Sequence, residues 1–273
     1  MLRSFARRRL GYQQNIGGNS DPGGALWLPR QRLSVYQCLR MTISIYDMDR
    51  TITRRGTWIP WLAFWLRTEA PWRLVLVPLL IGPGLAYWLG LIDRGRLKAL
   101  GQRLVMGRSV SRHRVERVAT AFARHVVTHD VFPDAITAFE TARAIGHTLV
   151  LATASNAYYV QAIAHLLGFD AVIATESRWV NDALLARLDG DNTYGEAKRI
   201  RIAGWLDTHD DPAAPFDFYS DHLSDLPSFE LAEARGGVAV AVNPSPPLRA
   251  EAARRGWTIV DWGATERSFF ERA

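Results

Sequence analysis

Two aspartates separated by a single residue, Asp47 and Asp49, follow a short apolar run at 42–46. In extended backbone a spacing of two points both carboxylates to the same side, so two acids face one site. One ionised carboxylate can attack a phosphorus atom in line, while the other protonates the leaving oxygen and then deprotonates the water that cleaves the aspartyl-phosphate. Taken alone, such a pair is more often a solvent-facing loop or a helix cap than a catalytic pair.

Two further polar clusters contain groups that bind phosphate. The segment 153–156, with Thr153 and Ser155, directly follows an apolar run and precedes an expected helix, so its hydroxyls and free N–H groups can hold phosphate oxygens. Capping of that helix by Ser155 or Asn156 is the alternative, and it is compatible with phosphate binding by Thr153. Lys198, one of two lysines in the chain beside Lys98, lies near the start of another expected helix. Its point charge can neutralise an attacking carboxylate and a transferring phosphoryl group.

A fourth cluster places Asp221 and Asp225 after an apolar run at 216–220, in a strand-to-helix turn. Hard carboxylate oxygens of this kind suit Mg²⁺. Helix capping by Ser224 or Asp225 is again the alternative. All four clusters follow expected strands, in the order nucleophile, phosphate hydroxyl, lysine and metal acid, which independent coincidences would rarely produce.

The elements that position these residues alternate along the chain. Apolar runs predict strands at 42–47, 147–153, 171–175, 216–220, 238–242 and 257–260, and amphipathic segments predict helices at 157–167, 195–206 and 226–234. Such alternation predicts an α/β fold, a Rossmann-like doubly wound parallel sheet. Residues 54–146 show helical periodicity. We therefore predict a catalytic core at 41–54 and 147–273, with an inserted helical cap at 55–146.

Composition narrows the compartment and the partners. Residues 1–40 carry seven arginines and one acid and predict a basic, disordered extension; alternatively, Met41 is the true start. Cys38 is the only cysteine, so no intramolecular disulfide forms, which suits a reducing cytoplasm. The net charge of +6 favours an anionic partner. No recognised binding motif accompanies the basic residues, so no nucleic acid is expected.

The order of these motifs resembles a known family. Asp47-x-Asp49-x-Thr51, Thr153, Lys198 and Asp221-x-x-x-Asp225 are similar to the four motifs of haloacid dehalogenase-like hydrolases, and the similarity covers about 42–262. The segment 219–227, YSDHLSDLP, is close to the form found in their phosphoserine phosphatase-like subfamily, IB. The resemblance implies the following roles: nucleophile and metal ligand for Asp47, general acid/base and metal ligand for Asp49, phosphate ligands for Thr153 and Lys198, Mg²⁺ ligand for Asp221, and support for Thr51 and Asp225.

The resemblance implies a Mg²⁺-dependent phosphatase that hydrolyses a phosphate monoester through an aspartyl-phosphate. Arg50 replaces a glycine that many relatives carry, and His222 replaces a common serine, but neither change removes a reacting group. Phosphoserine phosphatases usually carry a glutamate in the cap shortly after the first motif, whereas residues 53–58 contain no acid. The sequence of 53–58 is closer to that of phosphatidylglycerophosphate phosphatases. The expected substrate is therefore a lipid phosphate of that kind. The alternatives are a soluble small-metabolite phosphatase of phosphoserine phosphatase type and a catalytically idle relative that binds membrane or protein.

The expected cap contains an apolar segment at 58–92, within which 74–92 carries no charge. A single crossing of a membrane would separate Asp47 from Asp221, and Pro78 and Gly82 interrupt the run. A re-entrant or interfacial hairpin on the inner face of a membrane fits better, with basic flanks suited to anionic headgroups. The alternative is a pair of buried cap helices. The predicted partners are thus a phosphorylated small molecule or an anionic lipid, and a membrane surface.

Overall fold

The computed structural model describes residues 43–208 and 213–263. The predictions for the basic extension at 1–40, for Met41 as a start and for Cys38 lie outside the described residues. Residue 42, the expected first residue of the opening strand, lies outside them as well.

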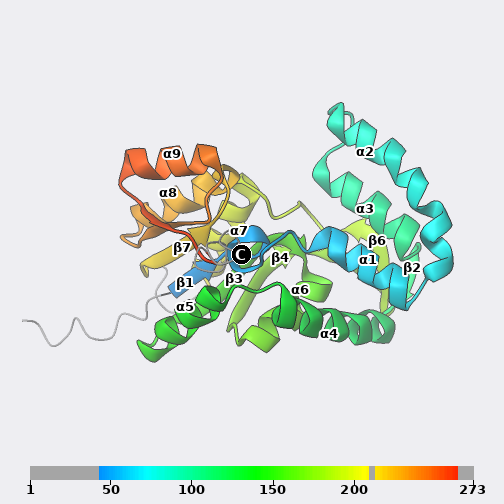
Figure 1. Cartoon of the computed structure of the whole chain (residues 1–273), viewed down its shortest axis with the longest axis horizontal. Coiled ribbons are helices and arrows are strands. Elements are labelled where there is room, and N and C mark those ends of the chain that lie inside the picture. The colour runs from blue at the N-terminus through cyan, green and yellow to red at the C-terminus, as the bar shows by residue number, and fades with distance from the viewer. Residues whose placement is uncertain (1–42, 209–212, 264–273) are drawn as a thin grey trace, which may run out of the picture. The chain divides into compact units, whose positions relative to one another are not determined.

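The predicted doubly wound parallel sheet is confirmed (Figure 1). Six parallel strands lie in the order β4-β3-β1-β7-β8-β9, so the opening strand β1 is central, between β3 and β7. The bounds are Ile43–Tyr46 (β1), Thr148–Asn156 (β3), Ala171–Thr175 (β4), Phe216–Ser220 (β7), Ala239–Val242 (β8) and Thr258–Val260 (β9). Because all six strands are parallel, their carboxyl ends meet at one edge of the sheet, where a site is expected.

Alternate residues of these strands supply two hydrophobic cores, one on each face of the sheet. Ile45, Val150 and Phe218 belong to one buried cluster, whereas Tyr46 and Leu151 belong to the other. The first cluster is covered by α7 (Glu196–Leu206), α8 (Leu226–Ala234) and α9 (Pro246–Arg255), and the second by α4 (Arg112–His129), α5 (Pro133–Ala144) and α6 (Ala157–Leu167). Because these strands are buried on both faces, successive residues are apolar, which explains the continuous apolar runs in the sequence.

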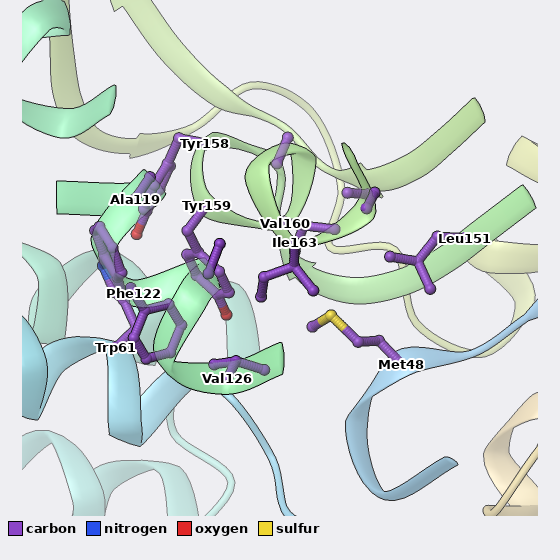
Figure 2. Packing of buried hydrophobic residues seen from close by; sticks show 14 of the residues in the cluster. Met48, Trp61, Ala119, Phe122, Val126, Leu151, Tyr158, Tyr159, Val160 and Ile163 are labelled. Atoms are coloured by element: carbon purple, nitrogen blue, oxygen red, sulfur yellow. The ribbon is translucent and has the colours of Figure 1, made fainter. Parts of the chain in front are cut away.

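The helices of the insertion join the core through an aromatic cluster. Trp61 of α1 (Trp58–Thr68) stacks on Tyr159 of α6, with ring centroids 5.1 Å apart, and Phe122 of α4 meets Tyr159 edge-on at 5.7 Å. Figure 2 shows these rings beside Val126 and Ile163. Stacked and edge-on aromatic pairs contribute stability beyond that of the apolar area they bury. The cluster therefore holds the start of the insertion against the core.

A second, antiparallel sheet was not expected from the sequence. Its three strands, in the order β2-β6-β5, are Ser109–Ser111 (β2), Ser177–Val180 (β5) and Ala183–Leu188 (β6). One strand therefore comes from the predicted cap at 55–146 and two come from outside it. The alanines and leucines of β6 favour helix locally, and only pairing with β2 and β5 makes them a strand. Asn181 and Asp182, both with positive φ, form the two-residue hairpin turn, a signal that the sequence does contain.

The part of the apolar segment that follows α1 is helical and exposed. It forms a 3-10 helix, η3 (Pro71–Leu80), and the short helix α2 (Ile81–Trp88), which pack against α3 (Arg94–Val105). Neither η3 nor α2 contains a buried residue, so the alternative of buried cap helices is wrong for 71–88. It is right for α1, at the start of the predicted segment 58–92, which buries Trp61, Leu62, Trp65 and Leu66. Within the described ranges, no helix is both long and apolar enough to cross a membrane.

Gly237 provides a sharp test of the sheet packing. A Cβ atom at this position would lie 1.8 Å from the carbonyl oxygen of Phe216, which starts the strand leading to Asp221. We predict that Gly237→Ala lowers the free energy of unfolding by about 3 kcal/mol or more, because backbone must move. Gly204→Ala, inside α7 with open space around its Cβ, is the control and should raise the free energy of unfolding by about 0.5–1 kcal/mol. Equal denaturant midpoints for the two variants would contradict this packing.

Candidate active site

Asp47 and Asp221 meet because their strands are neighbours. Each residue directly follows its strand, β1 or β7, and the register pairs Tyr46 with Tyr219. The backbone N–H of Asp47 donates to the carbonyl of Tyr219 at 2.8 Å, which extends the ladder into the site. The hydroxyl of Thr51 lies 3.2 Å from Oδ2 of Asp47 and 3.5 Å from Oδ1 of Asp221. The hydroxyl of Thr51 thus joins Asp47 to Asp221, which lies 170 positions after Thr51 in the sequence.

Lys198 forms the electrostatic centre of the site. Its ammonium group donates to Oδ1 of Asp47 at 2.8 Å and to Oδ2 of Asp225 at 2.7 Å, and all three residues are buried. The hydroxyl of Ser220 donates to the same oxygen of Asp225 at 2.7 Å. Asp225 therefore holds the lysine, and the lysine reaches across to the proposed nucleophile.

The carboxylates of this cluster outnumber the cations that are buried with them. Asp47, Asp221 and Asp225 face the single ammonium of Lys198, which leaves two negative charges unbalanced when all three acids are ionised. Burial raises the pKa of Asp47 to about 8, with Lys198 opposing the shift and the other two aspartates adding to it. Burial likewise raises the pKa of Asp221 to about 7. The pKa of Lys198 lies above its ordinary value because its two partners outweigh the desolvation of the ammonium.

Asp49 belongs to a separate hydrogen-bond network. Its Oδ1 accepts from the backbone N–H and the hydroxyl of Thr57, at 2.8 and 2.7 Å, and its Oδ2 accepts from the hydroxyl of Ser155 at 2.7 Å. The hydroxyls of Thr57 and Tyr159 are 3.3 Å apart, so the aromatic cluster supports this network. Both oxygens of Asp49 thus have partners other than the Asp47–Asp221 pair, which favours acid–base work for Asp49 over metal ligation by its side chain.

The end of β3 positions Thr153 in the same pocket. Thr153 is buried, and its hydroxyl accepts from the backbone N–H of Ser155 at 3.1 Å. The strand continues to Asn156 with a change of register, rather than ending at residue 153 as expected. Lys98 of α3 is also buried: its ammonium donates to the carbonyl of Ala154 at 2.5 Å and to Asn192 at 2.8 Å. Burial lowers the pKa of Lys98 to about 8, with the charge of Asp49 opposing the shift.

A pocket of about 270 Å³ opens over these groups. The predicted residues Asp47, Asp49, Thr153, Lys198, Asp221 and Asp225 all line it. Arg50 lines it too, with a positive φ of 67°, a backbone conformation that explains why a glycine is common at this position. Arg94 and Tyr194 complete one side, with the guanidinium carbon 4.0 Å from the ring centroid.

Four residues that line or support the site were not predicted from the sequence: Thr57, Lys98, Arg94 and Tyr194. Thr57 and Arg94 come from the insertion, Lys98 from its third helix and Tyr194 from the loop before α7, so no local spacing links them to the aspartates. For Lys98 one signal existed. Lysine is rare in this chain, with two residues beside 31 arginines, and both lysines are buried at the site. From this rarity we predicted a functional role for Lys198 alone, although the same signal applied to Lys98.

The donor set fits a magnesium ion. In the described part of the chain, no three histidine, cysteine or acidic side chains converge to enclose an ion. Mg²⁺, however, is commonly held by one or two carboxylates and completes its shell with water and substrate phosphate. Asp47 and Asp221 would supply those carboxylates, and the unbalanced charge of the cluster matches a divalent cation.

Comparisons with known proteins agree with this geometry. The family model described as haloacid dehalogenase-like hydrolase matches residues 45–230. A probable phosphatase of Mycobacterium tuberculosis is 30% identical over 148 residues, 54% of this chain and 50% of that protein. A second relative, the inhibition of morphological differentiation protein of Streptomyces azureus, is 28% identical over 61% of this chain and 58% of its own length. This chain thus spans 50% of the length of the first relative and 58% of the second.

Solved structures share the fold. A Bordetella pertussis protein of unknown function superposes with a TM-score of 0.70 at 23% identity, covering 82% of this chain and 99% of that chain. A probable phosphoserine phosphatase from Vibrio cholerae gives a TM-score of 0.56 at 14% identity, covering 78% and 61%. The family model spans more than half of the chain and includes Asp47, Thr153, Lys198 and Asp221. The chain therefore belongs to the haloacid dehalogenase-like hydrolases, with a fold like that of phosphoserine phosphatases.

Proposed function

We propose that this protein is a Mg²⁺-dependent phosphatase that hydrolyses a phosphate monoester through an aspartyl-phosphate at Asp47. The observation that supports it most is the contact of Lys198 with both Asp47 and Asp225, beside Asp221, in a pocket that also contains Asp49. An attacking carboxylate, a phosphate-binding ammonium and a separate acid are thus gathered in one place.

The residues divide the reaction into two displacements at phosphorus. In the first, a carboxylate oxygen of Asp47 forms a bond to phosphorus while the ester P–O bond breaks, and Asp49 gives its proton to the leaving oxygen. In the second, Asp49 takes a proton from water, the water oxygen attacks phosphorus, and the acyl phosphate bond breaks to release phosphate and free Asp47. Lys198 and Thr153 hold the oxygens of the transferring group throughout.

The positions of the supporting residues explain how the two aspartates keep different roles. Thr57 and Ser155 fix the carboxyl group of Asp49 away from the Lys198 cluster. Ser220 and Asp225 fix Lys198 against Asp47. A bound Mg²⁺ would offset the negative charge of Asp47, Asp221 and the phosphate as they approach one another.

The remainder of the pocket favours a substrate without an amino group near the phosphate. Beyond the four aspartates and Lys198, the charged groups that line it are Arg50 and Arg94, and His222 lines it as well. The segment where phosphoserine phosphatases usually carry a glutamate here contributes Thr57, whose hydroxyl is already bonded to Asp49. We infer a phosphate ester whose other part is neutral or anionic. Lipid phosphates and small metabolites both satisfy this condition, whereas an idle, non-catalytic relative would not need the intact cluster.

Asp47→Asn tests the nucleophile. An amide cannot form the acyl phosphate, so we predict that turnover of a phosphate monoester falls at least about a thousandfold, with thermal stability retained. Asp189→Asn, an exposed aspartate paired with Arg178, serves as the matched control and should keep full activity. Phosphate release by Asp47→Asn at the rate of the unmodified protein would refute the assignment.

Thr57→Val tests the positioning of Asp49. The change removes one hydrogen bond to Oδ1 of Asp49 and keeps the volume, so we expect kcat to fall roughly tenfold while KM changes little. Thr68→Val is the control, because that hydroxyl only donates to the carbonyl of Phe64 in its own helix. Steady-state kinetics of both variants give the answer. A change in KM alone would show that Thr57 contacts substrate instead of holding the acid.

Magnesium affinity should depend on pH. With pKa values of about 8 and 7, Asp47 and Asp221 are protonated in the metal-free protein at mildly acidic pH. Because a raised carboxyl pKa favours the protonated folded state, the contribution of these two groups to metal-free stability is fully present below about pH 4 and is lost as pH rises through 7 and 8. Mg²⁺ must displace these protons, so its affinity should rise about tenfold or more from pH 6 to pH 8.

Calorimetric titration with Mg²⁺ at several pH values measures this linkage. The variant Asp221→Asn should flatten the dependence as well as weaken binding, since it removes one of the two titrating ligands. A magnesium affinity independent of pH in the unmodified protein would contradict the proposed ligand pair.

A further inference from the structure

An exposed apolar surface covers the outer part of the insertion. We call residues 72–91, within η3 and α2 and the turn that follows, the apolar cap surface. Of the seventeen large apolar side chains that are exposed in the described ranges, eleven belong to it: Trp72, Leu74, Val75, Val77, Leu79, Ile81, Leu85, Tyr87, Trp88, Leu89 and Leu91. Contiguous exposure on this scale is unusual for a surface that faces only water and marks a site of contact.

The packing of the insertion does not account for this surface. No residue of η3 or α2 is buried, and the side chains of Val75 and Trp88 are 77% and 78% exposed. The opposite side of η3 and α2 contacts α3. Figure 1 shows α2 at the opposite side of the described structure from α5, α8 and α9, so the sheet and its covering helices leave this surface uncovered. The outward side of the apolar cap surface is therefore not covered by another described element.

The charges around the apolar cap surface are of one sign. Arg67, Arg96, Arg103 and Arg108 are exposed on the segments that flank it. The acids of 67–108 are two, and both have partners: Glu69 is bonded to Arg114 and Arg117, and Asp93 caps α3 by accepting from the N–H of Arg96. The unpaired charge beside the apolar residues is thus positive, as suits a negatively charged surface.

We propose that the apolar cap surface binds the interface of an anionic phospholipid bilayer, lying in its plane. η3 and α2 follow one another directly, with helical backbone at Leu80 and Ile81. Their apolar side chains would bury into the boundary between headgroups and acyl chains, and the arginines would contact anionic headgroups. Trp72 and Trp88, near the start of η3 and at the end of α2, have the amphipathic rings that favour this depth. A bilayer accepts apolar side chains without requiring a complementary shape. It can therefore bind a surface in which Pro78, Gly82 and Pro83 interrupt the series of large apolar side chains.

The apolar cap surface also leads directly to the pocket. Three residues after Leu91, Arg94 begins α3, lines the pocket and covers Tyr194. Arg94 therefore connects the apolar cap surface to the wall of the pocket. The membrane inference stands independently of the phosphatase proposal, because none of its residues belongs to the aspartate cluster.

Flotation of the full chain with vesicles tests the proposal. We expect the protein to float with phosphatidylcholine vesicles that contain phosphatidylglycerol, and to float less with phosphatidylcholine alone or at high salt. Val75→Glu/Trp88→Glu should lower the partition coefficient at least about tenfold. Ile59→Glu/Ile145→Glu adds the same charge at exposed apolar positions outside the surface and should bind like the unmodified protein. Circular dichroism and hydrolysis of a small phosphate ester verify that all variants are folded.

Two flotation results would overturn the membrane proposal, and a third would come from sedimentation. One is an unmodified protein that stays with the soluble fraction in the presence of either vesicle. The other is equal loss of binding in the two double variants, which would assign the binding to net charge alone. If sedimentation shows instead a concentration-dependent dimer that only Val75→Glu/Trp88→Glu dissociates, the surface contacts a second copy and the lipid assignment is wrong. Loss of phosphatase activity in Asp47→Asn leaves all of these outcomes unchanged.

Discussion

The ammonium group of Lys198 lies between the carboxylates of Asp47 and Asp225, and all three groups are buried. A buried charge without partners is costly, so each member of this cluster depends on the others and on the elements that carry them. Asp47 directly follows β1, Lys198 belongs to α7, and Asp225 lies in the turn after β7. The central position of β1 in the sheet allows all three to meet at one edge.

The same cluster imposes a charge imbalance that gives the site its chemistry. Three carboxylates around one ammonium retain negative charge, and burial shifts two of the acids toward their protonated forms. A divalent cation would reverse that shift and make Asp47 available as an anion. The acid–base group, Asp49, is held apart by Thr57 and Ser155, which are supported by the ring cluster around Tyr159. Separation of the two aspartates therefore depends on the insertion as much as on the core.

Much of this arrangement was predictable from the sequence because strand ends carry local signals. Asp47, Thr153 and Asp221 each lie at the carboxyl end of an apolar run, and the six strands and three helices predicted for the core are present. The helix α9 was not predicted, and β3 extends beyond its predicted end to Asn156. The network around Asp49 was not predictable, because Thr57 and Ser155 are 98 residues apart and meet only through tertiary packing. The β5–β6 hairpin was missed for a related reason. Its alanines and leucines have helical propensity, and pairing with β2 overrides it.

The account rests on Asp47 as the group that receives the phosphoryl. The most direct measurement is to quench the enzyme in acid during turnover, reduce it with borohydride and sequence the peptides by mass spectrometry. An acyl phosphate at residue 47 would be reduced to homoserine at that position, in an amount that rises with the steady-state level of the intermediate. Active enzyme that yields homoserine at another aspartate, or carries its phosphoryl group on a serine, threonine or histidine, would contradict the account.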